Sequence, residues 1–328
     1  MITAVIGGGS WATALTKILT GNGHEVNWWV RRSEMADYIN THHHNPDYLS
    51  DVEIDISKTT VTTDINLALN DAEQAILAVP SAFVEQAFET MKAGALHNKK
   101  VFSAIKGIIP SRLMIVGDYL HHQLKLPLND IGVITGPCHA EEVALEKLSY
   151  LTIACQNPET ASQFAGMIKC RYIKATVSDD IYGTEYAAVL KNVIAIASGI
   201  CHGLGYGDNF QAVLVSNSLQ EIKRFIDAVH PTERDINDSA YLGDLLVTCY
   251  SQFSRNRTFG NMIGKGYSVT SAQMEMNMIA EGYYAVACIQ KINDKLKVKM
   301  PVCEAVYNIL YKKLPARKEI EQLAELMN

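Results

Sequence analysis

The stretch that decides the fold is Thr3-Ala4-Val5-Ile6-Gly7-Gly8-Gly9-Ser10-Trp11-Ala12, near the start of this 328-residue chain. It places an apolar strand before a glycine turn, and an apolar-periodic helix follows. In the G-x-G-x-x-G/A motif the first glycine makes the turn, the second lets backbone approach a pyrophosphate, and the third small residue allows close packing. Gly7, Gly9 and Ala12 occupy these positions. The sequence therefore predicts a Rossmann-type dinucleotide site.

The end of the second expected strand, residues 25–30, carries the pair Arg31-Arg32. Sites specific for NAD usually have an acidic residue there that binds the ribose hydroxyls, whereas a guanidinium suits a 2′-phosphate. The sequence therefore favours NADP(H) as the cofactor and leaves NAD(H) open.

Strand signals alternate with helix signals as far as about residue 180 and then cease. Apolar runs that end at glycine or proline predict parallel strands of βαβ units, and two more strand signals follow them; the runs are residues 74–79, 100–105, 131–135, 151–155 and 171–175. From residue 181 onward the apolar residues recur with the period of a helix. We predict an α/β protein with a Rossmann-type doubly wound sheet in residues 1–180 and an all-helical domain in residues 181–328.

Composition favours a cytoplasmic enzyme. The net charge of -6 argues against nucleic acid or an anionic membrane as the main partner. The seven cysteines lack C-x-x-C spacing, which indicates thiols in a reducing compartment, and the early first strand leaves no room for a leader. The apolar stretch 187–204 is interrupted by polar residues and predicts a core helix. The side chains of His42-His43-His44 diverge, so we expect no metal site there.

Lys191 is a lysine within an apolar helical stretch whose neighbouring positions are mostly small. Either a tightly packed helix or a ligand could fill the space above this face. Partial burial would lower the pKa of the amine and suit it to proton transfer near neutral pH. The alternative is a surface lysine with its stem along the helix, and the residues alone do not decide between them.

Three other segments carry candidate chemistry. Lys106 follows a strand end, beside Gly107. Ser254-Arg255-Asn256-Arg257 groups forked and neutral donors that match the oxygens of a phosphate, although a solvated basic turn has the same composition. Asp244 and Glu281 lie next to glycines, and taken singly each is typical of a turn or helix cap.

Together these motifs resemble the bacterial-type NAD(P)-dependent glycerol-3-phosphate dehydrogenases over essentially the whole chain. The matching segments are Gly7-Gly8-Gly9-Ser10-Trp11, Ala78-Val79-Pro80-Ser81, Lys106-Gly107, Gly136-Pro137, Ala140-Glu141-Glu142-Val143, Leu190-Lys191-Asn192-Val193, Leu242-Gly243-Asp244-Leu245, Ser254-Arg255-Asn256-Arg257 and Glu281-Gly282. The resemblance implies a helical domain like the C-terminal domain of 6-phosphogluconate dehydrogenase. The implied activity is reduction of dihydroxyacetone phosphate to sn-glycerol 3-phosphate, a phospholipid precursor, and a homodimer fits the family.

The resemblance also implies residue roles. Lys191 would be the general acid/base. Substrate contacts would come from Lys106, Gly136, Cys138, Lys191, Asp244, Ser254, Arg255 and Asn256. Cofactor contacts would come from Gly7, Gly9, Ser10, Trp11, Arg31, Arg32, Lys106, Ala140, Arg255, Ile279 and Glu281.

This chain departs from the family pattern at Cys138, where serine or threonine is commoner, and at Tyr241, which replaces a glycine. A thiol is a weaker hydrogen-bonding group than a hydroxyl. Two other functions compatible with the residues are a hydroxyacid or ketoacid reductase of the same superfamily and a non-catalytic NADP(H)-binding sensor.

Overall fold

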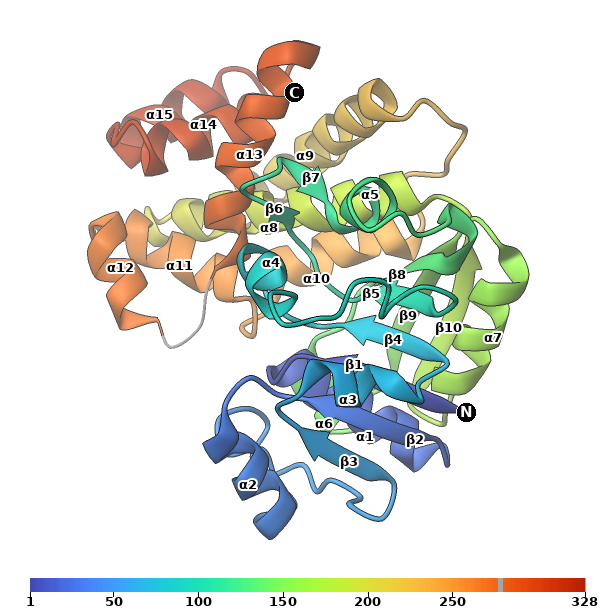
Figure 1. Ribbon diagram of the computed structural model, residues 1–328. Coiled ribbons are helices and arrows are strands. Elements are labelled where there is room, and N and C mark those ends of the chain that lie inside the picture. The colour runs from blue at the N-terminus through green and yellow to red at the C-terminus, as the bar shows by residue number, and fades with distance from the viewer. Residues whose placement is uncertain (277–279, 328) are drawn as a thin grey trace. The chain divides into compact units, whose positions relative to one another are not determined.

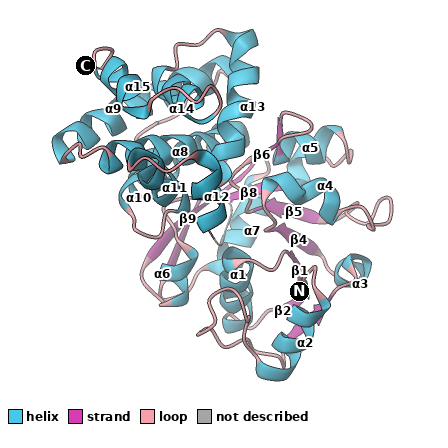
Figure 2. Cartoon of the chain, turned by 90° about the vertical axis from the view of Figure 1, so that its left-hand side faces the viewer, coloured by secondary structure: helices cyan, strands magenta, loops and turns pink. Residues whose placement is uncertain are grey.

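The computed structural model describes residues 1–276 and 280–327, and the chain forms two compact units. Unit 1 comprises Met1–Ile105 and Val116–Ile181, and unit 2 comprises Lys106–Ile115 and Tyr182–Asn328. Figure 1 follows the chain by colour from the N-terminus. Figure 2 shows that most strands belong to the N-terminal half of the chain and that helices make up most of the C-terminal half.

Unit 1 is a sheet with helices, as the sequence predicts. Its strands are β1 (Ile2–Ile6), β2 (Glu25–Trp29), β3 (Thr59–Thr62), β4 (Gln74–Leu77), β5 (Lys100–Ser103), β8 (Ile131–Thr135), β9 (Ser149–Cys155) and β10 (Ile173–Ser178). Its helices are α1 (Ser10–Gly21), α2 (Ser33–His42), α3 (Ile65–Asn70), α4 (Val84–Ala87), α5 (Val116–His122), α6 (Ala140–Ala144) and α7 (Pro158–Ile168). Short 3-10 turns at Ser81–Phe83 and Leu128–Asp130 complete the unit.

The strand order in the described sheet is β10-β9-β8-β5-β4-β1-β2-β3. Its neighbours run parallel except β8 and β9, which pair antiparallel. From β1 the chain proceeds outward through β2 and β3, and from β4 it proceeds outward the other way, so the order reverses between β1 and β4. Ligands of doubly wound sheets bind beyond the carboxyl ends of strands at such a reversal. The glycine turn that follows β1 lies at this point, and the predicted α/β class is confirmed.

The regular secondary structure in the described part of unit 2 is helical except for a two-stranded ribbon. The ribbon is β6 (Ile108–Ile109) with β7 (Met114–Ile115), and a π-helical segment spans Ser239–Gly243. The helices are α8 (Ile181–Gly203), α9 (Asp208–Val229), α10 (Asp244–Tyr250), α11 (Arg255–Gly264), α12 (Val269–Glu275), α13 (Glu281–Leu296), α14 (Pro301–Leu310) and α15 (Ala316–Ala324).

Helix α8 is the centre of the core of unit 2. Among the described residues it is the one helix long and apolar enough to cross a membrane, but 89% of its most apolar window is buried inside the protein. Its side chains, from Ala187 to Cys201, contribute much of a continuous hydrophobic cluster. The helix is therefore packed as a core helix, as its polar interruptions predict.

The segment from Lys106 to Ile115 belongs to unit 2, although the sequence boundary near residue 180 assigned it to the first domain. Ile108 and Ile115 are 1% and 0% exposed and belong to the same hydrophobic cluster as α8. Burial of these two side chains explains why the ribbon packs with the helices. Lys106, the first residue of the segment, consequently lies in the same unit as Lys191.

Candidate active site

The glycine turn after β1 has the geometry that a dinucleotide motif requires. Gly7 has φ +139°, and a Cβ there would lie 2.5 Å from the carbonyl oxygen of Ala78, so a side chain is excluded. A Cβ on Gly9 would meet no described atom within 4 Å, which leaves room for a ligand to approach the backbone. Ala12 is fully buried, as the third position of the motif demands.

Two further features of this turn fit a bound dinucleotide. Helix α1 has Gly9 at its N-cap and no side-chain cap, so its first amide groups can bind the oxygens of a pyrophosphate. The indole Nε1 of Trp11 is buried and has no hydrogen-bond partner in the described structure. A buried polar atom of this kind normally finds a partner, and a ligand at this turn could supply one.

Arg31 and Arg32 follow β2, at the edge where the adenosine ribose is expected. Both side chains are exposed, and Arg32 forms an ion pair with Asp47, a residue of the loop after α2. The sequence predicts the loop but does not indicate that its carboxylate reaches Arg32, because the two residues are 15 positions apart. Asp47 is thus a partner of a predicted cofactor-binding residue, and sequence reasoning missed this contact.

The segment after β8 contains three predicted contact residues, all in unit 1. Gly136 has φ +112°, and a Cβ there would lie 2.8 Å from the carbonyl oxygen of Tyr150, which explains the glycine. Cys138 is 8% exposed and belongs to the hydrophobic core cluster, where a small sulfur-containing side chain fits. Ala140 is the first residue of α6.

The catalytic candidates meet in unit 2 around one carboxylate. Asp244 is 1% exposed, and its Oδ1 accepts a short hydrogen bond from Nζ of Lys191. Its other oxygen, Oδ2, lies 3.5 Å from Nζ of Lys106. The side chain of Lys191 is almost completely buried, whereas that of Lys106 is 19% exposed. One carboxylate therefore bridges two amines and leaves an excess of positive charge when both are protonated.

Burial decides the protonation behaviour of Lys191. Desolvation lowers the pKa of its amine to about 7, and the nearby charge of Lys106 acts in the same direction. Asp244 opposes both effects because its negative charge favours the ammonium form. An amine with a pKa near neutrality can donate a proton in one reaction direction and accept it in the other.

Neighbouring polar contacts hold this group in position. Nδ2 of Asn192 donates to the carbonyl oxygen of Lys106 over 2.8 Å and so ties the ribbon segment to α8. The hydroxyl of Thr248 donates to the carbonyl oxygen of Asp244 over 2.6 Å. Asp244, which taken singly is typical of a turn or helix cap, follows a π-helical segment that ends at Gly243 and continues directly into α10. Tyr241, the departure from the family pattern, is buried in this segment.

The predicted phosphate-binding segment forms the start of α11. Ser254 is the N-cap and accepts a hydrogen bond from the backbone N–H of Arg257 at 3.3 Å. Arg255 is exposed, whereas Asn256 is buried and its Oδ1 accepts from the backbone N–H of Gly282 at 2.9 Å. This bond brings the start of α13, with Glu281, beside α11. Ile279, the remaining predicted cofactor contact, lies outside the described residues.

Glycines set the distance between α8 and α11. A Cβ on Gly260 would lie 2.1 Å from the carbonyl oxygen of Ile196, and a Cβ on Gly199 would lie 2.0 Å from that of Arg257. Gly203 and Gly264 meet the facing helix just as closely. The helix that carries Lys191 and the helix that begins with the predicted phosphate-binding segment are therefore held in direct backbone contact.

Comparison with known proteins identifies the family of the chain. The family model for the NAD-dependent glycerol-3-phosphate dehydrogenase N-terminus matches residues 2–161, and that for the C-terminus matches residues 180–321. The glycerol-3-phosphate dehydrogenase [NAD(P)+] of Staphylococcus carnosus is 34% identical over 98% of this chain and 96% of its own. That of Bacillus subtilis is also 34% identical, over 99% of this chain and 96% of its own.

A solved structure extends the agreement to three dimensions. The glycerol-3-phosphate dehydrogenase of Coxiella burnetii superposes with a TM-score of 0.91 at 27% identity, covering 99% of this chain and 98% of the other. Nearly the whole chain is matched in both sequence and fold. The chain belongs to the NAD-dependent glycerol-3-phosphate dehydrogenase family.

Proposed function

We propose that this enzyme reduces dihydroxyacetone phosphate to sn-glycerol 3-phosphate with NAD(P)H, reversibly, and so provides the backbone of glycerophospholipids. The observation that carries the proposal is the buried group of Lys191, Asp244 and Lys106. The relatives are named glycerol-3-phosphate dehydrogenase [NAD(P)+], which supports glycerol 3-phosphate and NAD(P)+ as the reactants of the reverse reaction.

When bound, the reduced nicotinamide supplies a hydride to the C2 carbonyl carbon. Lys191 donates the proton to the carbonyl oxygen, so the C=O bond becomes CH–OH and the amine becomes neutral. Asp244 holds Lys191 in place through its hydrogen bond, and Lys106 adds positive charge where the oxygen becomes negative. In the oxidation direction the neutral amine accepts the proton from the hydroxyl.

The substrate phosphate is assigned to Ser254, Arg255 and Asn256. The exposed guanidinium of Arg255 offers forked donors to phosphate oxygens, while buried Asn256 fixes the segment to Gly282. We assign supporting substrate contacts to Gly136 and the backbone at Cys138. Cofactor contacts are assigned to the glycine turn with Ser10 and Trp11, and to Ala140 and Glu281.

We further propose that NADPH is preferred to NADH, because Arg31-Arg32 stands where an acidic residue would favour NAD(H). A cytoplasmic homodimer acting on a small phosphate substrate completes the proposal. Light scattering of the purified enzyme tests the oligomeric state.

The test of the catalytic assignment compares Lys191→Ala, Lys191→Arg and a control, Lys291→Ala, which changes an exposed lysine of α13. Lys191→Ala should lose about 100-fold or more in turnover, the range of general acid-base catalysis with lost charge stabilisation. Lys191→Arg should also be poor, because a guanidinium does not release its proton.

Turnover is measured as NADPH or NADH oxidation after addition of dihydroxyacetone phosphate, and cofactor affinity by fluorescence. Cofactor binding should be unchanged in both Lys191 variants. Near-normal turnover of Lys191→Ala would refute the assignment. Cofactor binding by the unmodified enzyme without turnover on this substrate would refute the proposed function and favour another reductase or a sensor.

A further inference from the structure

The loop between α2 and β3, residues 43–58, is fixed to the glycine turn at its beginning. Asn45 is completely buried, and its Nδ2 donates to the carbonyl oxygen of Gly8 at 3.0 Å and to the hydroxyl of Thr13 at 2.9 Å. Its Oδ1 accepts from the backbone N–H of Asp47 at 3.1 Å and of Tyr48 at 3.2 Å. Asn45 thereby sets the position of the Asp47 backbone relative to the dinucleotide motif.

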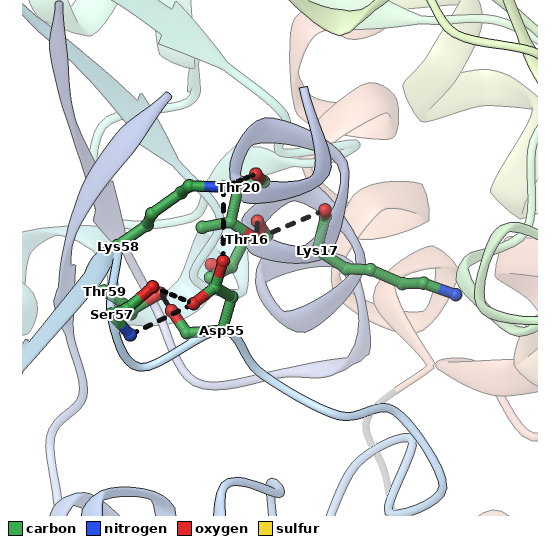
Figure 3. Close-up of polar contacts among 7 residues, drawn as sticks. All are labelled: Thr16, Lys17, Thr20, Asp55, Ser57, Lys58 and Thr59. Atoms are coloured by element: carbon green, nitrogen blue, oxygen red, sulfur yellow. Dashed lines mark hydrogen bonds and ion pairs between the residues drawn. The ribbon is translucent and has the colours of Figure 1, made fainter. Parts of the chain in front are cut away.

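The end of the same loop is fixed to the other end of α1, as Figure 3 shows. Nζ of Lys58 lies 3.3 Å from Oδ2 of Asp55 and donates to the carbonyl oxygen of Thr20 at 3.4 Å. Oδ1 of Asp55 accepts from the backbone N–H and the hydroxyl of Ser57 at 3.0 and 2.5 Å. Since both ends are attached to α1, the loop is a structured part of unit 1.

The carboxylate of Asp47 lies against the guanidinium of Arg32. The two side chains form an ion pair and remain 42% and 50% exposed. Arg32 is also the N-cap residue of α2, directly after the strand end where the ribose is assigned. A 2′-phosphate that binds Arg32 must therefore displace Asp47 from the guanidinium or accept a carboxylate close to its own negative charge. A ribose with a free 2′-hydroxyl carries no charge there, so it neither has to displace Asp47 nor is repelled by its carboxylate.

We propose that Asp47 is a specificity-determining residue that opposes the 2′-phosphate of NADP(H) through its ion pair with Arg32. The ion pair partly neutralises the charge of Arg32. It therefore reduces the ratio of kcat/KM for NADPH to kcat/KM for NADH, and NADH can still be used by the same site. This inference rests on the proposed assignment of the adenosine ribose to the end of β2. The Asn45 anchor gives it a structural basis, because the anchor fixes the Asp47 backbone independently of its carboxylate.

The test is a double-mutant cycle of Asp47→Asn and Arg32→Ala, with Asp51→Asn as a matched control from an exposed position of the same loop. The readout is the kcat/KM for NADPH divided by that for NADH at low ionic strength. Asp47→Asn should raise this ratio about two- to fivefold, the effect expected of one exposed charge pair. Arg32→Ala should lower the ratio, and Asp47→Asn should then have no effect in the Arg32→Ala background. Asp51→Asn should leave the ratio unchanged.

Each outcome decides a different point. If Arg32→Ala lowers the ratio but Asp47→Asn leaves it constant or lowers it, the proposed role of Asp47 is wrong and the proposed cofactor site still stands. An equal effect of Asp51→Asn overturns it too, because the change would then reflect overall charge. A ratio unaffected by Arg32→Ala overturns both the inference and the assignment of the ribose to this strand end. Unfolding temperatures identify any variant that loses its fold.

Discussion

Asp244→Asn removes the carboxylate between two lysines and keeps the size of the side chain. In the native protein desolvation and the charge of Lys106 lower the pKa of Lys191, Asp244 raises it, and the net result is a pKa of about 7. The substitution leaves the two lowering effects without the opposing one. The pKa of Lys191 should therefore fall further below its usual range, and the ammonium form should be lost at a lower pH.

The magnitude follows from the contact between the two groups. Losing an opposite charge at hydrogen-bonding distance should lower the pKa by about one to two units. Reduction requires the ammonium form, so its rate falls as the pH rises through the pKa of Lys191. Well above that pKa, each unit of downward shift costs about tenfold in the protonated fraction. At slightly alkaline pH the variant should thus lose roughly ten- to a hundredfold in reduction, and at about pH 5.5 it should recover much of that loss.

The assay is a pH-rate profile of reduction and oxidation for the wild-type enzyme, Asp244→Asn and an exposed control, Asp238→Asn. In Asp244→Asn the fall of the reduction rate and the rise of the oxidation rate should both occur at lower pH. Reduction loses the ammonium form of Lys191 at a lower pH, and oxidation gains the neutral amine at a lower pH. Asp238→Asn should match the wild type. Limbs that do not move, or that move to higher pH, would refute the conclusion that Asp244 controls the charge state of Lys191.

Three other predictions follow from contacts in unit 2. Gly260→Ala should lower the free energy of unfolding in urea by about 2 kcal/mol or more, because its Cβ would overlap the carbonyl oxygen of Ile196. The control Gly166→Ala, in open space on α7, should not lower it. Equal losses of unfolding free energy in the two variants would contradict close packing of α8 against α11. Arg255→Ala should raise the KM for dihydroxyacetone phosphate far more than the KM for glyceraldehyde, since only the former has a phosphate. Equal effects on the two KM values would indicate that Arg255 stabilises the structure or binds the cofactor instead. Burial raises the pKa of Glu221 to about 7 although the backbone N–H groups of Val302 and Cys303 donate to its carboxylate at 2.9 Å. Since this pKa is higher in the folded than in the unfolded state, the stability it contributes is present below about pH 4.5 and lost as the pH rises through about 7. Glu221→Gln should accordingly unfold with a weaker dependence on pH between 5 and 8 than the wild type, and an unchanged dependence would refute the assignment.

Most of unit 1 could be predicted from the sequence because its signals are local. The glycine turn, the buried strand runs and their glycine or proline ends each lie within about ten residues. The antiparallel course of β9 could not be predicted, because strand direction depends on pairing with β8 and not on composition. The placement of Lys106–Ile115 in unit 2 was missed for the same reason: Ile108 and Ile115 look like any buried apolar residues until their neighbours are known.

The partners of the site residues were harder to predict than the residues themselves. Lys191 is conspicuous as a lysine in an apolar helix, but Asp244 is 53 positions away and its glycine neighbour suggests only a turn. Asp47 likewise lies in a loop of ordinary composition. An ion pair between distant segments leaves no local pattern, so only the three-dimensional fold could identify Asp244 and Asp47 as the groups that face these cations.

The structure shows what meets helix α8 at two positions along its length. The helix spans 23 residues, about 34 Å at 1.5 Å per residue, so one part can pack against a helix while another carries chemistry. Gly199 and Gly203 meet the backbone of α11 in the C-terminal half. Lys191, two turns earlier, meets Asp244 instead. The same helix therefore joins the helix–helix contact to Lys191, the proposed proton donor, and fixes the position of this residue relative to the segment proposed to bind the substrate phosphate.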